Sequence, residues 1–387
     1  MKLAERLPGP PTEEDFDSPL RDERLTARIG VLLGICFGLA FVTGLISHLH
    51  YSPEPWLPLP SRPVWGYRVT QGLHVLSGTA AIPLLLVKLW SVYPKLFAEI
   101  PKGRIGTLVL NLVERASIGV LVAAAIFELA SGLANSSQWY PWGFHFRATH
   151  YAIAWLAIGS LILHIAVKLP VIRRALGEPL TGPEPGPSYA GPSRRALLRT
   201  TWIASGVAVA AAAGNTVPFL RKVSVFAVRN GRGPEGIPIN KSAKAADVVA
   251  TALDSSFTLT LRRGAREVSL TRADLKAMTQ RGHTLPIACV EGWSASGTWT
   301  GVRLRELLDL VDGPAGSDVE FRSLQQHGAF GHSLLPGNFA DDPLTLLALR
   351  LNGEELSIDH GYPCRLIAPD RPGVFQTKWV HEIEVQA

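Results

Sequence analysis

The sequence predicts a multi-domain protein: an all-α bundle of four transmembrane helices, a fifth transmembrane helix, and then an α+β, mainly β, domain. The mean hydropathy of +0.17, with 18% charged residues among 387, is too apolar for a soluble chain of this size. Long apolar runs fill the first 220 residues. The rest of the chain alternates polar and apolar residues in short runs bounded by turn signals, as strands do.

The membrane part begins after a polar tail. Residues 1–28 contain proline and lack a short apolar stretch with a cleavage site, so we expect a cytoplasmic tail and no removable signal peptide. Four apolar runs follow, each near the ~20 residues that cross a bilayer. They lie at 29–49, 69–90, 116–134 and 148–169. We therefore expect a membrane domain over residues 29–175.

Basic residues predict the orientation of these spans. The connection 93–104 carries three Lys or Arg residues, and Arg173 and Arg174 follow the fourth run. The connection 50–68 carries two Arg residues in a longer segment, and the connection 135–147 carries one. By the positive-inside rule, the N-terminus and the end of the fourth helix are cytoplasmic. Topology also explains the net charge of +6 better than a nucleic-acid-binding face does.

A Pro/Gly linker with an internal basic motif is expected at residues 176–199. It ends in Ser-Arg-Arg-Ala-Leu-Leu-Arg at 193–199, which resembles a twin-arginine export signal. A plain basic flank of a fifth helix at 200–220 explains the same residues, and both interpretations can hold together. The fifth helix would place residues 221–387 outside the cytoplasm of a multi-pass cell-membrane protein.

Histidines lie inside the apolar runs, where polar side chains are costly and usually functional. His74 lies in the second run, and His150 and His164 lie in the fourth. His150 and His164 are 164 − 150 = 14 residues apart, so they share a helix face. Their separation along the axis is roughly 21 Å. His74 and His150 both lie near the outer ends of their runs, so we expect them to bind one haem b iron from both sides. The alternative is that they are hydrogen-bonded polar residues without a metal.

The histidine pattern is similar to that of the cytochrome b subunits of formate dehydrogenases and hydrogenases, in which two fourth-helix histidines at this spacing serve two haems. A second haem at His164 would need a ligand at the cytoplasmic side. Lys88 lies at about the right depth, but lysine is an unusual haem ligand. Glu128, inside the third run, is a candidate for proton handling at a quinone site. His48 and His50 are interpreted as interfacial polar residues.

The sequence pattern of the C-terminal part predicts strands, a short helix and a hairpin turn. Residues 257–261 and 267–270 alternate as strands, Thr271 caps a short helix, and Asn352-Gly353 signals a hairpin.

One cysteine stands out from the other two. Three cysteines without a CxxC pair exclude a disulfide framework and typical zinc or iron–sulfur ligation, and Cys36 and Cys364 are interpreted as packing residues. Cys289 follows an apolar strand at 285–288 and enters a loop rich in Gly and Trp. A thiolate there suits a soft or high-valent metal or acts as a nucleophile, whereas a buried structural cysteine is the alternative.

Two sequence blocks carry a family resemblance. The first is Cys-Val-Glu-Gly-Trp-Ser at 289–294 with Trp-Thr-Gly-Val-Arg-Leu at 299–304. The second is Asp-His-Gly-Tyr-Pro-Cys-Arg-Leu-Ile-Ala-Pro at 359–369 with Gln-Thr-Lys-Trp-Val at 376–380. Together they resemble the sulfite oxidase superfamily of molybdopterin-dependent oxidoreductases.

The resemblance implies a site. It gives Cys289 as the molybdenum ligand, and Arg365 and Lys378 as the residues that hold the pterin phosphate. It also places Asn240 and His360 beside the cofactor. Apart from the resemblance, His327 follows Gln325-Gln326 and is a candidate for the border of the substrate pocket, with an ordinary loop histidine as the alternative.

The implied reaction is oxygen-atom transfer, with electrons passing through the haem. Eukaryotic sulfite oxidases carry basic residues directly after the cysteine, whereas Glu-Gly-Trp at 291–293 argues against sulfite. The pattern is more similar to the bacterial periplasmic methionine sulfoxide reductase system, so we expect a quinol-linked reductase of an S-oxide or N-oxide. The alternatives are a quinone-reducing oxidase of sulfite or another small sulfur compound, and an electron-transfer or sensor protein with a vestigial molybdenum domain.

Overall fold

The computed structural model describes residues 12–16, 18–52, 55–98, 105–180, 191–227, 234–328 and 330–386. The chain forms two compact units. The first unit comprises Met1–Val42 and Leu73–Ala212, and the second comprises Thr43–Gly72 and Ala213–Ala387. Residues 1–11 of the expected tail, 181–190 of the expected linker and 99–104 of the basic connection lie outside the described residues.

Five helices are long and apolar enough to cross a membrane by length and composition, counted over the described residues. They are α1 (Glu23–Tyr51), α2 (Gly66–Val92), α3 (Ile105–Ser136), α4 (Phe146–Gly177) and α5 (Arg194–Ala213). Two short 3-10 helices, η1 (Glu13–Phe16) and η2 (Tyr93–Phe97), also belong to the first unit.

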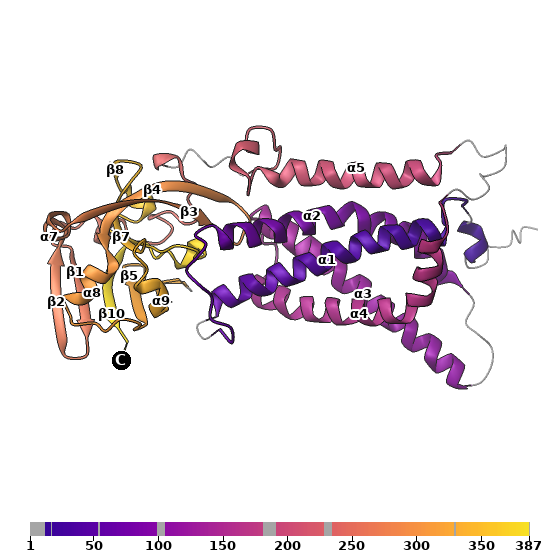
Figure 1. Ribbon diagram of the computed structural model, residues 1–387, viewed down its shortest axis with the longest axis horizontal. Helices are drawn as coiled ribbons and strands as arrows, with labels where there is room; N and C mark the ends of the chain where they lie inside the picture. The colour runs from indigo at the N-terminus through magenta and orange to yellow at the C-terminus, as the bar shows by residue number, and fades with distance from the viewer. Residues whose placement is uncertain are drawn as a thin grey trace, which may run out of the picture. The chain divides into compact units, whose positions relative to one another are not determined.

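The helices of the first unit pack side by side (Figure 1). The rings of Phe41 on α1 and Trp155 on α4 are 4.9 Å apart, and Ser205 Oγ on α5 donates to Ala80 O on α2 at 3.0 Å. Large apolar side chains face outward, with Leu86 and Ile162 each 63% exposed. An apolar exterior on packed helices is typical of a surface that meets lipid.

The fifth helix begins earlier than its expected start at residue 200. It starts at Arg194, and the Ala196 N–H donates to Ser193 Oγ at 3.2 Å, so Ser193 caps the first turn. The expected twin-arginine motif is therefore part of helix α5. The helix ends at Ala213, before Gly214.

The second unit contains two five-stranded sheets. The first has the order β2-β1-β10-β5-β6, in which β1 and β10 are parallel. Its strands are β1 (Thr258–Arg263), β2 (Arg266–Thr271), β5 (Val319–Ser323), β6 (His332–Leu335) and β10 (Val380–Val385). The second sheet has the order β3-β4-β7-β8, and β9 pairs with β7. Its strands are β3 (Gln280–Ala288), β4 (Ser294–Arg303), β7 (Leu346–Leu351), β8 (Glu354–Glu355) and β9 (Arg365–Ile367).

Short helices complete this unit. They are α6 (Val249–Ala252), α7 (Arg272–Ala277), α8 (Leu304–Asp309), α9 (Gly337–Ala340), η3 (Pro218–Leu220), η4 (Pro234–Gly236), η5 (Ile358–His360) and η6 (Gly373–Phe375). Thr271 caps α7 as expected, and Asn352 and Gly353, with φ of +51° and +89°, form the turn between β7 and β8. Buried residues of both sheets, such as Phe321 and Leu347, form one core. Cys364 is part of this core, as expected.

The connection between α1 and α2 belongs to the second unit. Arg62 forms an ion pair with Asp342 at 2.9 Å, and Asn338 Nδ2 donates to Leu59 O at 3.0 Å. Residues 43–72, which the sequence places in the membrane domain, therefore pack against the domain that carries the sheets.

Candidate active site

A tight loop between β3 and β4 presents Cys289. Ala288, the last residue of β3, pairs with Ser294, the first residue of β4, so residues 289–293 form the connection. The Cys289 N–H donates to Trp293 O at 2.9 Å, and the Gly292 N–H donates to Cys289 O at 3.0 Å. Gly292 has a φ of +91°, which glycine adopts without strain. Two paired strands therefore hold the cysteine in a fixed loop.

The sulfur of Cys289 lies beside a carboxylate. Its side chain is only 3% exposed, and its Sγ lies 3.7 Å from Glu291 Oε2. Trp293 Nε1 donates to the same carboxylate oxygen at 2.9 Å. Burial raises the pKa of the Cys289 thiol, and the negative charge of Glu291 raises it further. A bound metal cation would deprotonate such a thiol, because thiolate is the ligating form.

Two cations lie in the same pocket, Arg365 buried and Lys378 partly buried. Arg365 on β9 is 3% exposed, and its guanidinium donates to His360 O at 3.1 Å and Gln376 O at 3.0 Å. Its Nε is buried without a hydrogen-bond partner. Lys378 Nζ donates to Asp359 O at 3.0 Å and also to Lys241 O. Among the described residues, neither cation forms an ion pair with a carboxylate.

Neither cation has a carboxylate within ion-pair distance in the described chain, and the charge of Asp359 offsets that of Lys378 only in part. Burial lowers the pKa of Arg365 to about 9. Burial, and then the charge of Arg365, lower the pKa of Lys378 to about 7. A phosphate would supply the missing negative charge, with Arg binding two oxygens and Lys acting as a point charge.

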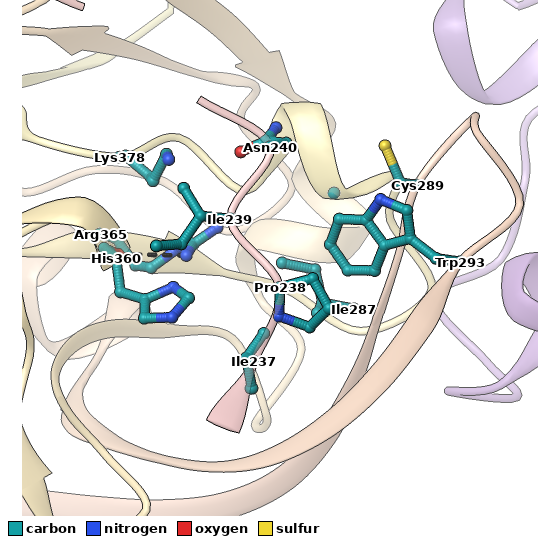
Figure 2. Close-up of a pocket in the computed structure, with 11 residues that line it drawn as sticks. Ile237, Pro238, Ile239, Asn240, Ile287, Cys289, Trp293, His360, Arg365 and Lys378 are labelled. Carbon is teal, nitrogen blue, oxygen red and sulfur yellow. Dashed lines mark hydrogen bonds between the residues drawn. The ribbon is translucent and has the colours of Figure 1, made fainter. Parts of the chain in front are cut away.

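One pocket joins these groups (Figure 2). Figure 2 shows Cys289 beside Trp293 at one end, the side chains of Arg365 and His360 toward the other, and the segment 237–240 between them. The pocket is lined by Ile237, Pro238, Ile239, Asn240, Ile287, Cys289, Trp293, His360, Arg365, Gly373 and Lys378. All five site residues expected in this part of the chain therefore share one pocket. His327 is not among the lining residues.

Two helix histidines lie close together in the first unit. The ring centroids of His74 on α2 and His150 on α4 are 6.1 Å apart, with an interplanar angle of 78°. His74 Nδ1 lies 2.8 Å from Ala40 O, which leaves Nε2 for a metal. Metal–imidazole bonds of about 2 Å would put two opposed rings at a similar centroid separation. His150 Nε2, however, lies 3.1 Å from Glu128 Oε2, a contact that iron ligation through Nε2 would replace.

Comparison with known proteins identifies part of the chain. Residues 246–387 match the model of the family described as oxidoreductase molybdopterin binding domain. These residues, which we call the molybdopterin-binding domain from here on, make up just over a third of the chain. The range contains Cys289, His360, Arg365 and Lys378, whereas Asn240 precedes it.

Three relatives show how far the similarity extends. Nitrate reductase (NADPH) of Mycosarcoma maydis is 36% identical over 116 residues, 24% of this chain and 12% of the relative. A putative protein-methionine-sulfoxide reductase subunit of Azospira oryzae is 30% identical over 113 residues, 29% of this chain and 42% of the relative. The catalytic subunit of protein-methionine-sulfoxide reductase of Xanthomonas campestris is 32% identical over 124 residues, 28% of this chain and 38% of the relative. The chain thus covers less than half of each relative.

The pocket of the molybdopterin-binding domain fits its family's cofactor. Two cations, neither in an ion pair with a described carboxylate, suit the pterin phosphate, and a buried thiol at the opposite end suits the metal. Among the described residues, no group of three or more His, Cys, Asp or Glu side chains could hold a metal by itself.

The remaining predicted residues lie elsewhere. Lys88, considered as a partner of His164, donates from Nζ to Thr26 O at 3.0 Å. His50, interpreted as an interfacial residue, is buried in the second unit with its ring 4.9 Å from that of Tyr67. Gln71 was not among the residues predicted from the sequence, and its Nε2 donates to Val290 O in the Cys289 loop at 2.9 Å. No sequence signal indicates that contact, because it joins residues 219 positions apart.

Proposed function

We propose that this chain is a membrane-bound molybdenum-pterin oxidoreductase that takes electrons from quinol through a haem b and reduces an S-oxide or N-oxide. The carboxylate of Glu291, 3.7 Å from Cys289 Sγ, is the observation that favours this substrate class. A negative charge at that position repels anions such as sulfite and nitrate and leaves a neutral sulfoxide unaffected. Two of the relatives are named for methionine sulfoxide reduction, which supports the proposal.

Residues of the pocket would hold the molybdenum-pterin. Cys289 would ligate the metal as thiolate, Arg365 and Lys378 would bind the phosphate, and Asn240 and His360 would border the pterin. When bound, this cofactor supplies oxygen-atom transfer with a two-electron change. Reduction of an S-oxide consumes two electrons and two protons and yields a sulfide and water. Oxidation of one quinol releases two electrons and two protons, so the overall reaction balances.

The chain's own side chains orient this site. Trp293 Nε1 fixes the carboxylate of Glu291 beside the cysteine, at 2.9 Å. Trp293 and Cys289 are both buried, so they exclude water from the metal end of the pocket. His360 is also buried, and its Nε2 lies 3.6 Å from Glu235 Oε2.

We propose that His74 and His150 would hold one haem b, which would pass electrons one at a time. The contact of His74 Nδ1 with Ala40 O orients the ring so that Nε2 is available. Glu128 would move from His150 when iron binds, and we propose that it handles protons at a quinone site nearby. A second haem at His164 would need Lys88 to leave Thr26, so we propose a single haem.

The proposed location is the cell membrane, with the N-terminus in the cytoplasm and the molybdopterin-binding domain outside it. The five apolar helices and the basic residues around them support this topology.

Glu291→Gln tests the proposed substrate class. The amide removes the charge and retains an oxygen that accepts from Trp293. We expect kcat/KM for nitrate or sulfite to rise by roughly tenfold relative to methionine sulfoxide, since about 1.4 kcal/mol of lost repulsion corresponds to that factor. The matched control is Glu354→Gln, an exposed carboxylate on β8, which should leave the ratio unchanged. An unchanged ratio in Glu291→Gln would show that this carboxylate does not select the substrate.

A further inference from the structure

The backbone of the Cys289 loop is held by residues from outside the molybdopterin-binding domain. Gln71, on α2, is 3% exposed, and its Nε2 donates to Val290 O at 2.9 Å. Its Oε1 accepts from Ser47 Oγ on α1 at 3.1 Å. Both ends of the amide are therefore engaged, which fixes its orientation. All of these residues belong to the second compact unit.

The segment after α5 holds the other side of the loop. Thr216 Oγ1 donates to Gly292 O at 3.0 Å, and Arg221 Nη2 donates to Ser294 O at 2.8 Å. Gly72 lies so close to Thr216 that a Cβ at residue 72 would be 2.1 Å from Thr216 Cγ2. Residues from α1, from α2 and from the segment after α5 therefore orient the peptide groups beside the proposed metal ligand.

Gln71 also lies next to a proposed haem ligand in the chain. His74 follows it by three residues in the same helix α2, which is about 4.5 Å along the helix axis. On the other side, Val290 is bonded directly to Cys289. The hydrogen bond from Gln71 to Val290 thus links helix α2, which carries a proposed haem ligand, to the neighbour of the residue that would ligate molybdenum.

We propose that Gln71 is a positioning residue for electron transfer: its hydrogen bond to Val290 couples α2, and through it the haem, to the Cys289 ligand. This inference rests on the proposed function. In each transfer one electron leaves the reduced haem iron and one arrives at the metal bound by Cys289, and two transfers accompany reduction of one S-oxide. The reductant is quinol and the oxidant is the S-oxide.

The test compares full-length, cofactor-loaded wild type with Gln71→Met. Methionine has a similar length but neither donates to Val290 nor accepts from Ser47. Quinol-reduced protein is mixed rapidly with methionine sulfoxide, and haem oxidation is followed in a single turnover. We expect it to slow roughly tenfold, which corresponds to about 1.4 kcal/mol in the barrier. Turnover with a reduced viologen that donates directly to the molybdenum site, the Mo(V) electron paramagnetic resonance signal and the haem midpoint potential should be unchanged.

Two further variants sharpen the result. Ser47→Ala keeps the amide of Gln71 and should slow haem oxidation less than Gln71→Met does. Arg62→Ala removes the ion pair between Asp342 and the segment that connects α1 to α2, and it should leave the rate of haem oxidation unchanged.

Several outcomes would overturn the inference. An unchanged rate of haem oxidation in Gln71→Met would show that Gln71 does not couple the haem to the Cys289 ligand. Equal losses of the haem-linked and viologen-linked activities, or an altered Mo(V) signal, would show that Gln71 only shapes the loop. A wild-type haem that methionine sulfoxide never oxidises would overturn the proposed function together with this inference.

Discussion

Arg365, which is buried, and Lys378, which is partly buried, place two positive charges in one pocket, and neither forms an ion pair with a described carboxylate. Charges that lose hydration are unfavourable when their counter-charge is incomplete, and here the charge of Asp359 offsets that of Lys378 only in part. Binding of a phosphate restores that counter-charge, so the same residues that destabilise the empty pocket favour the filled one. The affinity for the cofactor and the protonation of Lys378 are consequently linked.

The linkage predicts a pH dependence of anion binding. The pKa of Lys378 is lowered to about 7 by burial and by Arg365, so above that pH an anion binds only if Lys378 takes up a proton. The affinity of cofactor-free protein for sulfate should therefore fall by about tenfold per pH unit above about pH 7. Titration calorimetry with sulfate measures this dependence. Lys378→Met should bind sulfate more weakly and without the decline just above pH 7.

A wild-type affinity that stays constant across that range would contradict the assignment of Lys378 to the anion site. Sulfate is the suitable probe because it does not titrate near neutral pH, unlike phosphate.

Single residues were predicted unevenly from the sequence. The placement of Cys289 follows from a local strand and loop, and the contact with Glu291 spans only two positions, so it was within reach of sequence reasoning. Arg365 and Lys378 were selected only by family resemblance, because an isolated Arg or Lys in a sequence does not reveal burial. Burial depends on how distant strands pack.

At the scale of elements, α2 begins against the molybdopterin-binding domain. Asp370 accepts a hydrogen bond from the Tyr67 N–H in the first turn of α2, so a carboxylate distant in sequence acts as its cap. Burial raises the pKa of Asp370 to about 6, although the Tyr67 N–H lowers it. The folded-state pKa is thus above the ordinary value of 3.8. The stabilising contribution of its protonated form is lost as the pH rises from about 4 to about 6.

Two substitutions of Asp370 distinguish the effect of its negative charge from the effect of its hydrogen bond with the Tyr67 N–H. Asp370→Ala should lower the free energy of unfolding by about 1 kcal/mol, because the Tyr67 N–H loses its acceptor. That change corresponds to a decrease of about 2–4 °C in the midpoint of thermal unfolding in detergent. Asp370→Asn keeps an acceptor without a buried charge, so it should match or exceed wild-type stability at neutral pH. Equal destabilisation by both variants would indicate that the negative charge itself is required.

Elements with local signals were predicted well. The apolar helices, the capped α7 and the turn between β7 and β8 follow from periodicity and from turn residues. Contacts that join distant segments, such as those of Gln71 with Val290 and of Asp370 with Tyr67, have no such signal. The start of α5 was placed too late because hydropathy marks the apolar run and not the Ser193 cap before it.

At the scale of the whole molecule, composition predicts an apolar helical part followed by a domain with sheets, and the structure contains both. Composition did not predict that residues 43–72 belong with the sheets. Their contacts with the Cys289 loop suggest why an anchor and a molybdopterin-binding domain share one chain: the ends of the helices help to form the site. We propose that electrons pass from quinol through the haem to the metal at Cys289.

The most direct test of that claim is redox spectroscopy of the purified, membrane-extracted protein, following the haem bands after quinol and then after methionine sulfoxide. Quinol should reduce the haem, and the sulfoxide should reoxidise it in wild type but not in Cys289→Ala, which should retain its haem. If the sulfoxide leaves the haem reduced, while sulfite reduces the oxidised haem only when Cys289 is present, electrons flow in the opposite direction and the proposed reductase is a quinone-reducing dehydrogenase.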